Sequence, residues 1–296
     1  MSFRTETNPH PRSDTERAEI LAAPGFGRYF TDHMVRIDWT EDGGWGEPAV
    51  VPYGPLSLDP ATAALHYGQE IFEGLKAYRQ PDGSIASFRP DANAARFRAS
   101  AARLAMAPLP DELFLASLAE LLDVDREWVP PAGGEESMYL RPFMVAAEVG
   151  LGVRPSAEYL YCVIASPAGP YFPGGVKPVD VWLSTDYTRA ALGGTGTAKC
   201  GGNYAASLLP QAQGAEHGCA QVVYLDAEEH RWIDEMGSNN LFFVYGSGDQ
   251  VEVVTPARML PVRAGVTTSV CSPEPYTKNR LFEPISSTHV RSSASR

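Results

Sequence analysis

The sequence predicts an α+β fold in two domains. Its 296 residues are enough for two domains of ordinary size. Segments typical of strands and of helices are mixed without the regular alternation of a doubly wound fold. A stretch rich in proline and glycine, PAGPYFPGGVKP at 167–178, has the composition of a linker between the two parts.

The composition excludes several classes of partner. The formal net charge is −12, which argues against nucleic acid because phosphate contacts require a basic face. No apolar run has the length of a membrane span, and the polar N-terminus does not resemble a secretory signal. The four cysteines are widely spaced and form no metal-binding pattern with the six histidines. We therefore expect a cytoplasmic protein with free thiols and no metal, in which small anionic ligands remain possible.

The first part of the chain is expected to hold a disordered lead at 1–24 and a small α+β domain at 25–168. Alternation and β-branched or aromatic content indicate the strands, and apolar stripes at helical spacing indicate two helices, the first capped by Asp91 or Asn93. In chain order, the expected elements are a strand in 26–39, a hairpin of 75–78 with 85–88, helices at 89–106 and 111–128, and buried strands at 138–145 and 159–165.

The second part is expected to begin after a linker at 169–178. A large domain is expected at 179–257, and a tail without a clear period, rich in Ser, Pro, Thr and Arg, follows at 258–296. The expected elements are strands at 179–185, 221–225, 241–245 and 251–255, with a helix at 204–216.

One lysine stands out in the second part. Lys199 lies within GGTGTAKCGGNY at 193–204, among glycines and small residues with no other charge. Partial desolvation in such surroundings would lower the pKa of the amine and make it a better nucleophile toward a carbonyl. A solvated lysine in a surface loop explains the same pattern.

The residues around Lys199 include the groups that pyridoxal 5'-phosphate requires. A tyrosine can bond the ring oxygen, a carboxylate can hold the ring nitrogen protonated, and an arginine can bind the phosphate. Tyr204, Glu235 and Arg96 are the candidates for these roles. Taken alone, Arg96 also fits a solvated helix face, and Glu235 an ordinary loop charge.

Seven motifs resemble those of the branched-chain amino acid aminotransferases, which are fold-type IV pyridoxal-phosphate enzymes. They occur in family order between about Gly25 and Ala257. They are FTDHM (30–34), LHYGQEIFEGLKAY (65–78), FRPDANAARF (88–97), YLRPF (139–143), GPYF (169–172), AKCGGNYAASL (198–208) and DEMGSNNLFFV (234–244).

The resemblance implies transamination between L-leucine, L-isoleucine or L-valine and 2-oxoglutarate through a pyridoxal-phosphate Schiff base on Lys199. It implies the cofactor contacts named above for Tyr204, Glu235 and Arg96, and a hydroxyl near the cofactor from Ser238. Arg141 matches the arginine that receives the side-chain carboxylate of glutamate. Phe26, Tyr67, Tyr139 and Tyr171 match the aromatic wall of the substrate pocket, and Leu151 and Val153 match a loop that reaches into the partner subunit of a homodimer.

The resemblance weakens after Ala257. The family's phosphate loop has only a weak counterpart in GVTT at 265–268, where Val266 and Thr267 are the candidates. From this we expect an incomplete second domain, through truncation or a shifted reading frame. Two alternatives to the implied function are a D-amino-acid transaminase or aminodeoxychorismate lyase of the same fold, and an inactive truncated paralogue.

Overall fold

The computed structural model describes residues 2–170, 175, 177–237, 239–240, 242–247 and 250–254. These form two compact units, one comprising Met1–Lys177 with Ala198–Gly201 and the other Pro178–Thr197 with Gly202–Arg296. The lysine segment Ala198–Gly201 therefore groups with the first unit, whereas the sequence led us to expect 179–257 as one domain. Four candidate residues, the tail at 258–296 and half of the expected linker lie outside the described residues; the four are Tyr171, Ser238, Val266 and Thr267.

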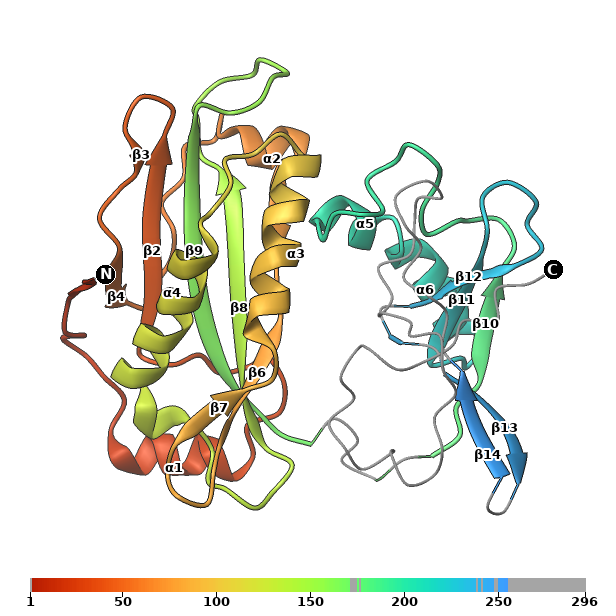
Figure 1. Cartoon of the computed structure of the whole chain (residues 1–296), viewed down its shortest axis with the longest axis horizontal. Coiled ribbons are helices and arrows are strands. Elements are labelled where there is room, and N and C mark those ends of the chain that lie inside the picture. The colour runs from red at the N-terminus through yellow and green to blue at the C-terminus, as the bar shows by residue number, and fades with distance from the viewer. Residues whose placement is uncertain are drawn as a thin grey trace. The chain divides into compact units, whose positions relative to one another are not determined.

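The first unit is built on one largely antiparallel sheet (Figure 1). Its strand order is β1-β4-β2-β9-β8-β6-β7, with β3 beside β2 and β5 beside β8. The expected hairpin is confirmed as β6 and β7. The strands are β1 (Arg4–Thr5), β2 (His33–Thr40), β3 (Gly44–Trp45), β4 (Ala49–Pro52), β5 (Glu70–Phe72), β6 (Leu75–Arg79), β7 (Ile85–Ser87), β8 (Ser137–Ala146) and β9 (Glu158–Ala168).

Strands β8 and β9 form the centre of this sheet. They pair over ten residues, from Ser137 opposite Ala168 to Ala146 opposite Tyr159. In β8 the even-numbered residues from Met138 to Ala146 are buried, whereas the odd-numbered residues from Tyr139 to Val145 are half-buried. Successive side chains of a strand point to opposite faces. One face of β8 therefore enters the core and the other stays partly open.

Helices α3 (Pro90–Arg103) and α4 (Asp111–Val124) cover one face of the sheet (Figure 1). They confirm the two expected helices, although the first begins differently from our expectation. Arg89, at φ 48°, is the N-cap, and Pro90 occupies the first turn, where its fixed φ suits a helix start. Phe97 and Phe114 meet Tyr161 of β9 in the core, with ring centroids 5.4–6.4 Å apart. Two shorter helices complete the unit, α2 (Ala63–Tyr67) and the 3-10 helix η1 (Arg126–Trp128).

The expectation of a disordered lead at 1–24 was wrong. Residues Asp14–Ala22 form helix α1, and Arg4–Thr5 pair with β4 as β1. A capping box begins α1: the Ser13 hydroxyl accepts a hydrogen bond from the Glu16 N–H, and the Glu16 carboxylate accepts one from the Ser13 N–H. Ile20 is the only buried residue of α1. The polar composition of this segment gave no apolar stripe from which the helix could be predicted, and the capping box was its only sequence signal.

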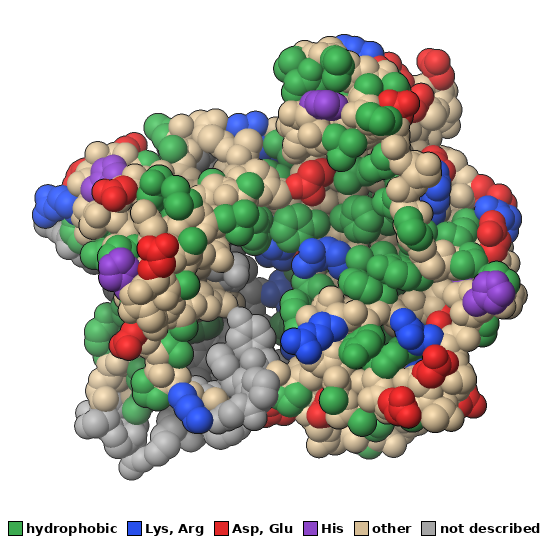
Figure 2. Space-filling model, turned by 180° about the vertical axis from the view of Figure 1, so that it is seen from behind, with side chains coloured by type: hydrophobic (Ala, Val, Ile, Leu, Met, Phe, Trp, Pro, Cys, Tyr) green, Lys and Arg blue, Asp and Glu red, His purple; other side chains and the backbone are tan. Residues whose placement is uncertain are grey.

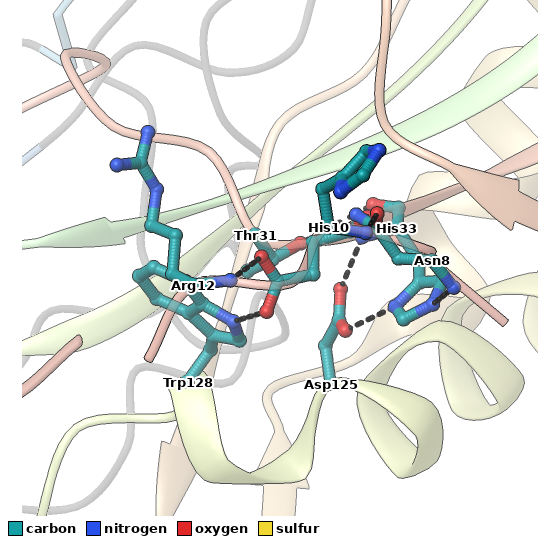
Figure 3. Close-up of polar contacts among 8 residues, drawn as sticks. Asn8, His10, Arg12, Thr31, His33, Asp125 and Trp128 are labelled. Carbon is teal, nitrogen blue, oxygen red and sulfur yellow. Dashed lines mark hydrogen bonds and ion pairs between the residues drawn. The ribbon is translucent and has the colours of Figure 1, made fainter. Parts of the chain in front are cut away.

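A polar cluster ties the N-terminal segment to the first unit (Figure 3). The Asp125 carboxylate accepts hydrogen bonds from the backbone N–H and the Nδ1 of His33, at 3.0 and 2.7 Å. His33 Nε2 accepts from the Asn8 N–H at 3.1 Å. Asp32 accepts from the Arg12 N–H and from Nε1 of Trp128. The cluster thus links the N-terminal segment, β2 and the end of α4.

Replacing Asp125 with alanine should lower the free energy of unfolding by about 2 kcal/mol, because two half-buried donors of His33 would lose their acceptor. Urea denaturation of wild-type and variant chains measures this difference. Asp123→Ala is the matched control, since that side chain is 80% exposed on the same helix and its loss should change stability by less than about 0.5 kcal/mol. Equal effects of the two substitutions would contradict the structural role of Asp125.

The described residues of the second unit form two small sheets and two helices. Strands β10 (Val181–Ser184), β11 (Gln221–Leu225) and β12 (Ile233–Met236) form one sheet, and β13 (Phe243–Ser247) pairs with β14 (Gln250–Val254). The single helix expected at 204–216 is divided into α5 (Gly201–Ala205) and α6 (Leu208–Glu216). At the break, the Ser207 hydroxyl donates to the Tyr204 carbonyl at 2.6 Å. Across the described parts of both units, no helix is long and apolar enough to cross a bilayer.

Candidate active site

The backbone on either side of Lys199 is fixed to the first unit by three hydrogen bonds. The Phe72 N–H donates to the Lys199 carbonyl at 3.0 Å, and the Lys199 N–H donates to the Ser100 hydroxyl at 2.9 Å. The Gly201 N–H donates to the Glu70 carboxylate at 2.5 Å. The neighbouring Ala198 and Cys200 are buried. These contacts explain why the lysine segment groups with the first unit.

Two glycines permit this close packing. A Cβ on Gly201 would overlap the Glu70 carboxylate, and a Cβ on Gly74 would overlap the Tyr139 hydroxyl. Glycine is required wherever a backbone approaches another group this closely. Both glycines belong to the motifs that the sequence singled out, in AKCGGNY and FEGLKAY.

Phe72 brings two cations together on the first unit. The Lys199 Nζ lies 4.5 Å from the centroid of the Phe72 ring, and the Arg141 guanidinium carbon lies 4.8 Å from it. Both distances suit cation–π attraction. Sequence reasoning had selected Lys199 and Arg141 but not Phe72, although Phe72 stands inside the motif LHYGQEIFEGLKAY.

Arg141 lies on the partly open face of β8 together with Tyr139. Its Nη2 donates to the Tyr139 hydroxyl at 2.9 Å, while its buried Nε has no hydrogen-bond partner among the described residues. Phe26 packs edge-on against Tyr139, with ring centroids 5.1 Å apart. The structure thus groups three residues predicted to bind substrate: Phe26, Tyr139 and Arg141.

The predicted phosphate ligand Arg96 lies on α3 and is held by Glu73. Its Nε and Nη2 donate to the two carboxylate oxygens of Glu73, at 2.5 and 2.7 Å. The Asn93 amide and the Gly74 N–H also donate to Glu73. The Glu73 side chain is fully buried, and that of Arg96 is 35% exposed. Sequence reasoning had not selected Glu73.

The remaining substrate candidates of the first unit form a separate group. The Tyr67 hydroxyl donates to the Leu151 carbonyl. Leu151 and Val153 are 64% and 83% exposed. The structure therefore leaves large apolar side chains of this loop on the surface, and it joins Tyr67 to the loop rather than to Phe72.

In the second unit, Arg189 connects the two predicted cofactor ligands. Its guanidinium carbon lies 4.9 Å from the centroid of the Tyr204 ring, and its Nε lies 3.8 Å from the Glu235 carboxylate. The side chains of Arg189 and Glu235 are only 4% and 3% exposed. Arg189 also donates to the Asn203 carbonyl. Sequence reasoning missed Arg189 because it belongs to none of the motifs and to no periodic pattern.

The glycine loop before Lys199 is tied to α5 by reciprocal hydrogen bonds. The Thr195 hydroxyl donates to the Asn203 side chain at 2.7 Å, and the Asn203 amide donates to the Thr195 carbonyl at 2.8 Å. Asn203 is buried. The loop is therefore fixed beside the Tyr204 helix, which differs from the solvated surface loop that the sequence alone also allowed.

Glu70 and Arg141 interact electrostatically in the first unit. Burial raises the pKa of Glu70, and its hydrogen bond from Gly201 and the positive charge of Arg141 oppose that shift. On the face shown in Figure 2, lysine and arginine side chains of this unit lie among apolar ones. Cations in partly apolar surroundings are screened less than solvated ones. Such a surface suits a ligand that carries carboxylate or phosphate groups as well as an apolar part.

Residues 70–272 match the family described as amino-transferase class IV. The chain belongs to this family. The match extends beyond Ala257, where the motifs quoted above end. It includes every candidate cofactor ligand and Arg141.

Comparison with individual proteins supports the same assignment and the fold-type IV architecture. The chain is 62% identical over 267 residues to a branched-chain-amino-acid aminotransferase of Mycolicibacterium smegmatis, covering 90% of this chain and 73% of that one. The corresponding aminotransferase of Escherichia coli matches with a TM-score of 0.56 at 26% identity, over 75% of this chain and 66% of that one.

A second solved branched-chain amino acid aminotransferase matches in the same way. Its crystal structure with pyridoxamine 5'-phosphate gives a TM-score of 0.55 at 28% identity, over 70% of this chain and 64% of that one. The chain thus spans about two thirds of the length of these two structures.

Asp234, next to Glu235, gives a pH-dependent prediction. Burial, and then the negative charge of Asp226, raise the pKa of Asp234 from 3.8 to about 6. The native state therefore holds this proton more tightly than the unfolded state, so the contribution of Asp234 to stability falls as pH rises through that interval. The melting temperature of Asp234→Asn should therefore rise relative to that of wild type as the pH increases from about 4 to about 7.

Thermal unfolding at a series of pH values measures this effect. Asp180→Asn is the control, since it removes the same charge from an exposed site in the same unit. The prediction fails if the difference in melting temperature between Asp234→Asn and wild type stays constant over the interval.

Proposed function

We propose that this chain is a transaminase that uses pyridoxal 5'-phosphate on Lys199 to exchange amino groups between L-leucine, L-isoleucine or L-valine and 2-oxoglutarate. The observation that carries the proposal is the arrangement around Phe72. An amine and a guanidinium lie 4.5 and 4.8 Å from one aromatic ring. The amine can act on a substrate Cα, the ring can receive an apolar side chain, and the guanidinium can receive the second carboxylate of glutamate.

The chain contains each kind of group that pyridoxal phosphate requires. Lys199 supplies the primary amine and Arg96 a cation for the phosphate. Tyr204 supplies a phenol for the ring oxygen, and the buried carboxylate of Glu235 would hold a proton on the ring nitrogen. Ser238, Val266 and Thr267 are proposed as further contacts. The bound cofactor supplies an electron sink for the bond broken at the substrate Cα.

Lys199 is also proposed to move the proton of the reaction. Its Nζ would remove the proton from the substrate Cα and return a proton during the exchange. The hydrogen bonds of its backbone to Phe72 and Ser100 hold the main chain in place, so that only the side chain needs to move. Arg189 holds Tyr204 by its guanidinium and balances the charge of Glu235.

The apolar and cationic residues account for the two kinds of substrate. Phe26 and Tyr139, with Tyr67 and Tyr171, would receive branched side chains, at about 1.5–3 kcal/mol for each fully buried one. Arg141 would bind the side-chain carboxylate of glutamate. The solved relative with pyridoxamine 5'-phosphate has also been crystallised with N-(5'-phosphopyridoxyl)-L-glutamate and with 4-methylvaleric acid, which supports one pocket for both classes of ligand.

A homodimer in the cytoplasm is part of the proposal. Leu151 and Val153 expose large apolar side chains on one loop. Burial of this loop against a second copy would remove that surface from water. In that arrangement the loop would line the substrate pocket of the partner subunit.

Lys199→Ala should abolish the absorbance that the bound cofactor shows near the edge of the visible range, because the amine that binds it covalently is gone. The measurement is an absorbance spectrum after reconstitution with pyridoxal phosphate. Lys177→Ala is the control, since that lysine is exposed and outside the proposed site. A folded wild-type chain that acquires no cofactor absorbance would overturn the proposed function.

Arg141→Met should raise the KM for 2-oxoglutarate about 30-fold, which corresponds to the loss of about 2 kcal/mol of charged hydrogen bonding. The KM for L-leucine should change much less, because its side chain carries no carboxylate. Steady-state assays with both substrates, and with D-alanine in place of L-leucine, test this. Preference for D-alanine would indicate a D-amino-acid transaminase, and cofactor binding without any transamination would indicate an inactive paralogue.

A further inference from the structure

The carboxylate of Glu73 is buried without being part of the hydrophobic core. Its side chain has no exposed surface, and four donors surround it: Nε and Nη2 of Arg96, the Asn93 amide and the Gly74 N–H. A buried carboxylate is very unfavourable unless it is paired and hydrogen-bonded. This arrangement satisfies both conditions and uses the site's predicted phosphate ligand to do so.

The pairing fixes the orientation of the Arg96 guanidinium. A guanidinium has five N–H donors in a rigid plane, and Glu73 engages one edge of it, formed by Nε and Nη2. Two parallel hydrogen bonds hold both the plane and its direction. The Arg96 side chain remains 35% exposed, so the group is held from the inside while part of it faces outward.

The same short segment also fixes Lys199. Within Glu70–Gly74, Glu70 accepts from the Gly201 N–H, the Phe72 N–H donates to the Lys199 carbonyl, and Glu73 holds Arg96. The segment itself is fixed by β5 pairing with β8 and by the Glu73 N–H, which donates to the Pro142 carbonyl at 2.7 Å. The amine and the guanidinium are therefore positioned from one rigid stretch of backbone.

We propose that Glu73 is a positioning residue which holds Arg96 in the orientation that binds the phosphate of pyridoxal phosphate, at a set spacing from Lys199. This inference rests on the proposed function. The Glu73 carboxylate does not touch the cofactor in this role. It acts through Arg96, and Asn93 supports it from the preceding turn of α3.

A purely structural role for the same pair makes a different prediction. If Glu73 and Arg96 only join α3 to the segment after β5, loss of Glu73 would weaken every ligand of the site to a similar degree. If Glu73 orients a phosphate ligand, its loss weakens ligands that carry the phosphate and spares those that lack it. Pyridoxal and pyridoxal phosphate differ in that group alone.

The experiment compares the binding of these two compounds to the wild-type apoprotein and to the Glu73→Gln apoprotein. Binding is monitored by the change in absorbance on reconstitution. We expect the dissociation constant for pyridoxal phosphate to rise about tenfold, the effect typical of losing a carboxylate that orients a ligand-binding group. The dissociation constant for pyridoxal should change less than about twofold, since Lys199 keeps its own anchors.

Asp111→Asn is the matched control. Asp111 accepts two hydrogen bonds, at 3.0 and 3.1 Å, from Arg98, which lies on the same helix as Arg96. This pair is more exposed than the pair of Glu73 and Arg96. Its loss should leave both dissociation constants unchanged. If Glu73→Gln does not fold, Asn93→Ala replaces it, because it removes only one of the donors to Glu73 and should give a smaller loss that is likewise confined to pyridoxal phosphate.

The outcomes separate the inference from the proposed function. A wild-type chain that binds pyridoxal phosphate, with a loss in Glu73→Gln that is selective for the phosphate, supports the inference. Equal losses for both compounds, or no loss, overturn it while leaving the proposed function intact. A folded wild-type chain that binds neither compound overturns the proposed function itself.

Discussion

The hydrogen bond from the Phe72 N–H to the Lys199 carbonyl joins two parts of the chain that are distant in sequence. Residues Ala198–Gly201 lie in the sequence between two stretches of the second unit, but they group with the first unit. Hydrogen bonds from this segment to the Ser100 hydroxyl and the Glu70 carboxylate hold its backbone at two further points. These contacts fix the position from which the Lys199 side chain extends.

The anchoring also explains why a glycine-rich loop is rigid at this point. Glycine loses more conformational entropy on folding than other residues, so a loop rich in glycine is ordered only where specific contacts compensate. Here the contacts come from both directions. Gly201 approaches the Glu70 carboxylate, and on the other side Thr195 and Asn203 exchange hydrogen bonds. Gly201 is therefore present for close approach, since a Cβ there would overlap the Glu70 carboxylate.

Much of the fold could be read from the sequence, because periodicity reports burial directly. The strands β8 and β9 and helices α3 and α4 carry clear apolar patterns and appear where expected. Helix α1 was missed because it buries only Ile20, so its evidence lay in the Ser13–Glu16 capping box rather than in a stripe.

Candidate site residues could be selected from the sequence where they carry chemistry in recognisable motifs. Lys199, Arg96 and Arg141 were selected in this way, and their roles stay predictions. Phe72 and Glu73 stood in the same motif but were not selected, because an apolar ring and a carboxylate acquire their roles only through the cations that they contact. Arg189 is defined by burial and by proximity to Tyr204 and Glu235, neither of which a linear pattern expresses.

The first unit holds its cations in two different ways. Glu73 pairs with Arg96 through a carboxylate, whereas Lys199 and Arg141 lie against the Phe72 ring, which brings no opposing charge. Burial raises the pKa of Glu70, and the positive charge of Arg141 opposes that shift. The net charge of −12 is spread over a solvated surface and screened within about 8 Å at physiological salt. A protein that is acidic as a whole can thus present a locally cationic, partly apolar surface, which is the property that an amino acid with a second carboxylate requires.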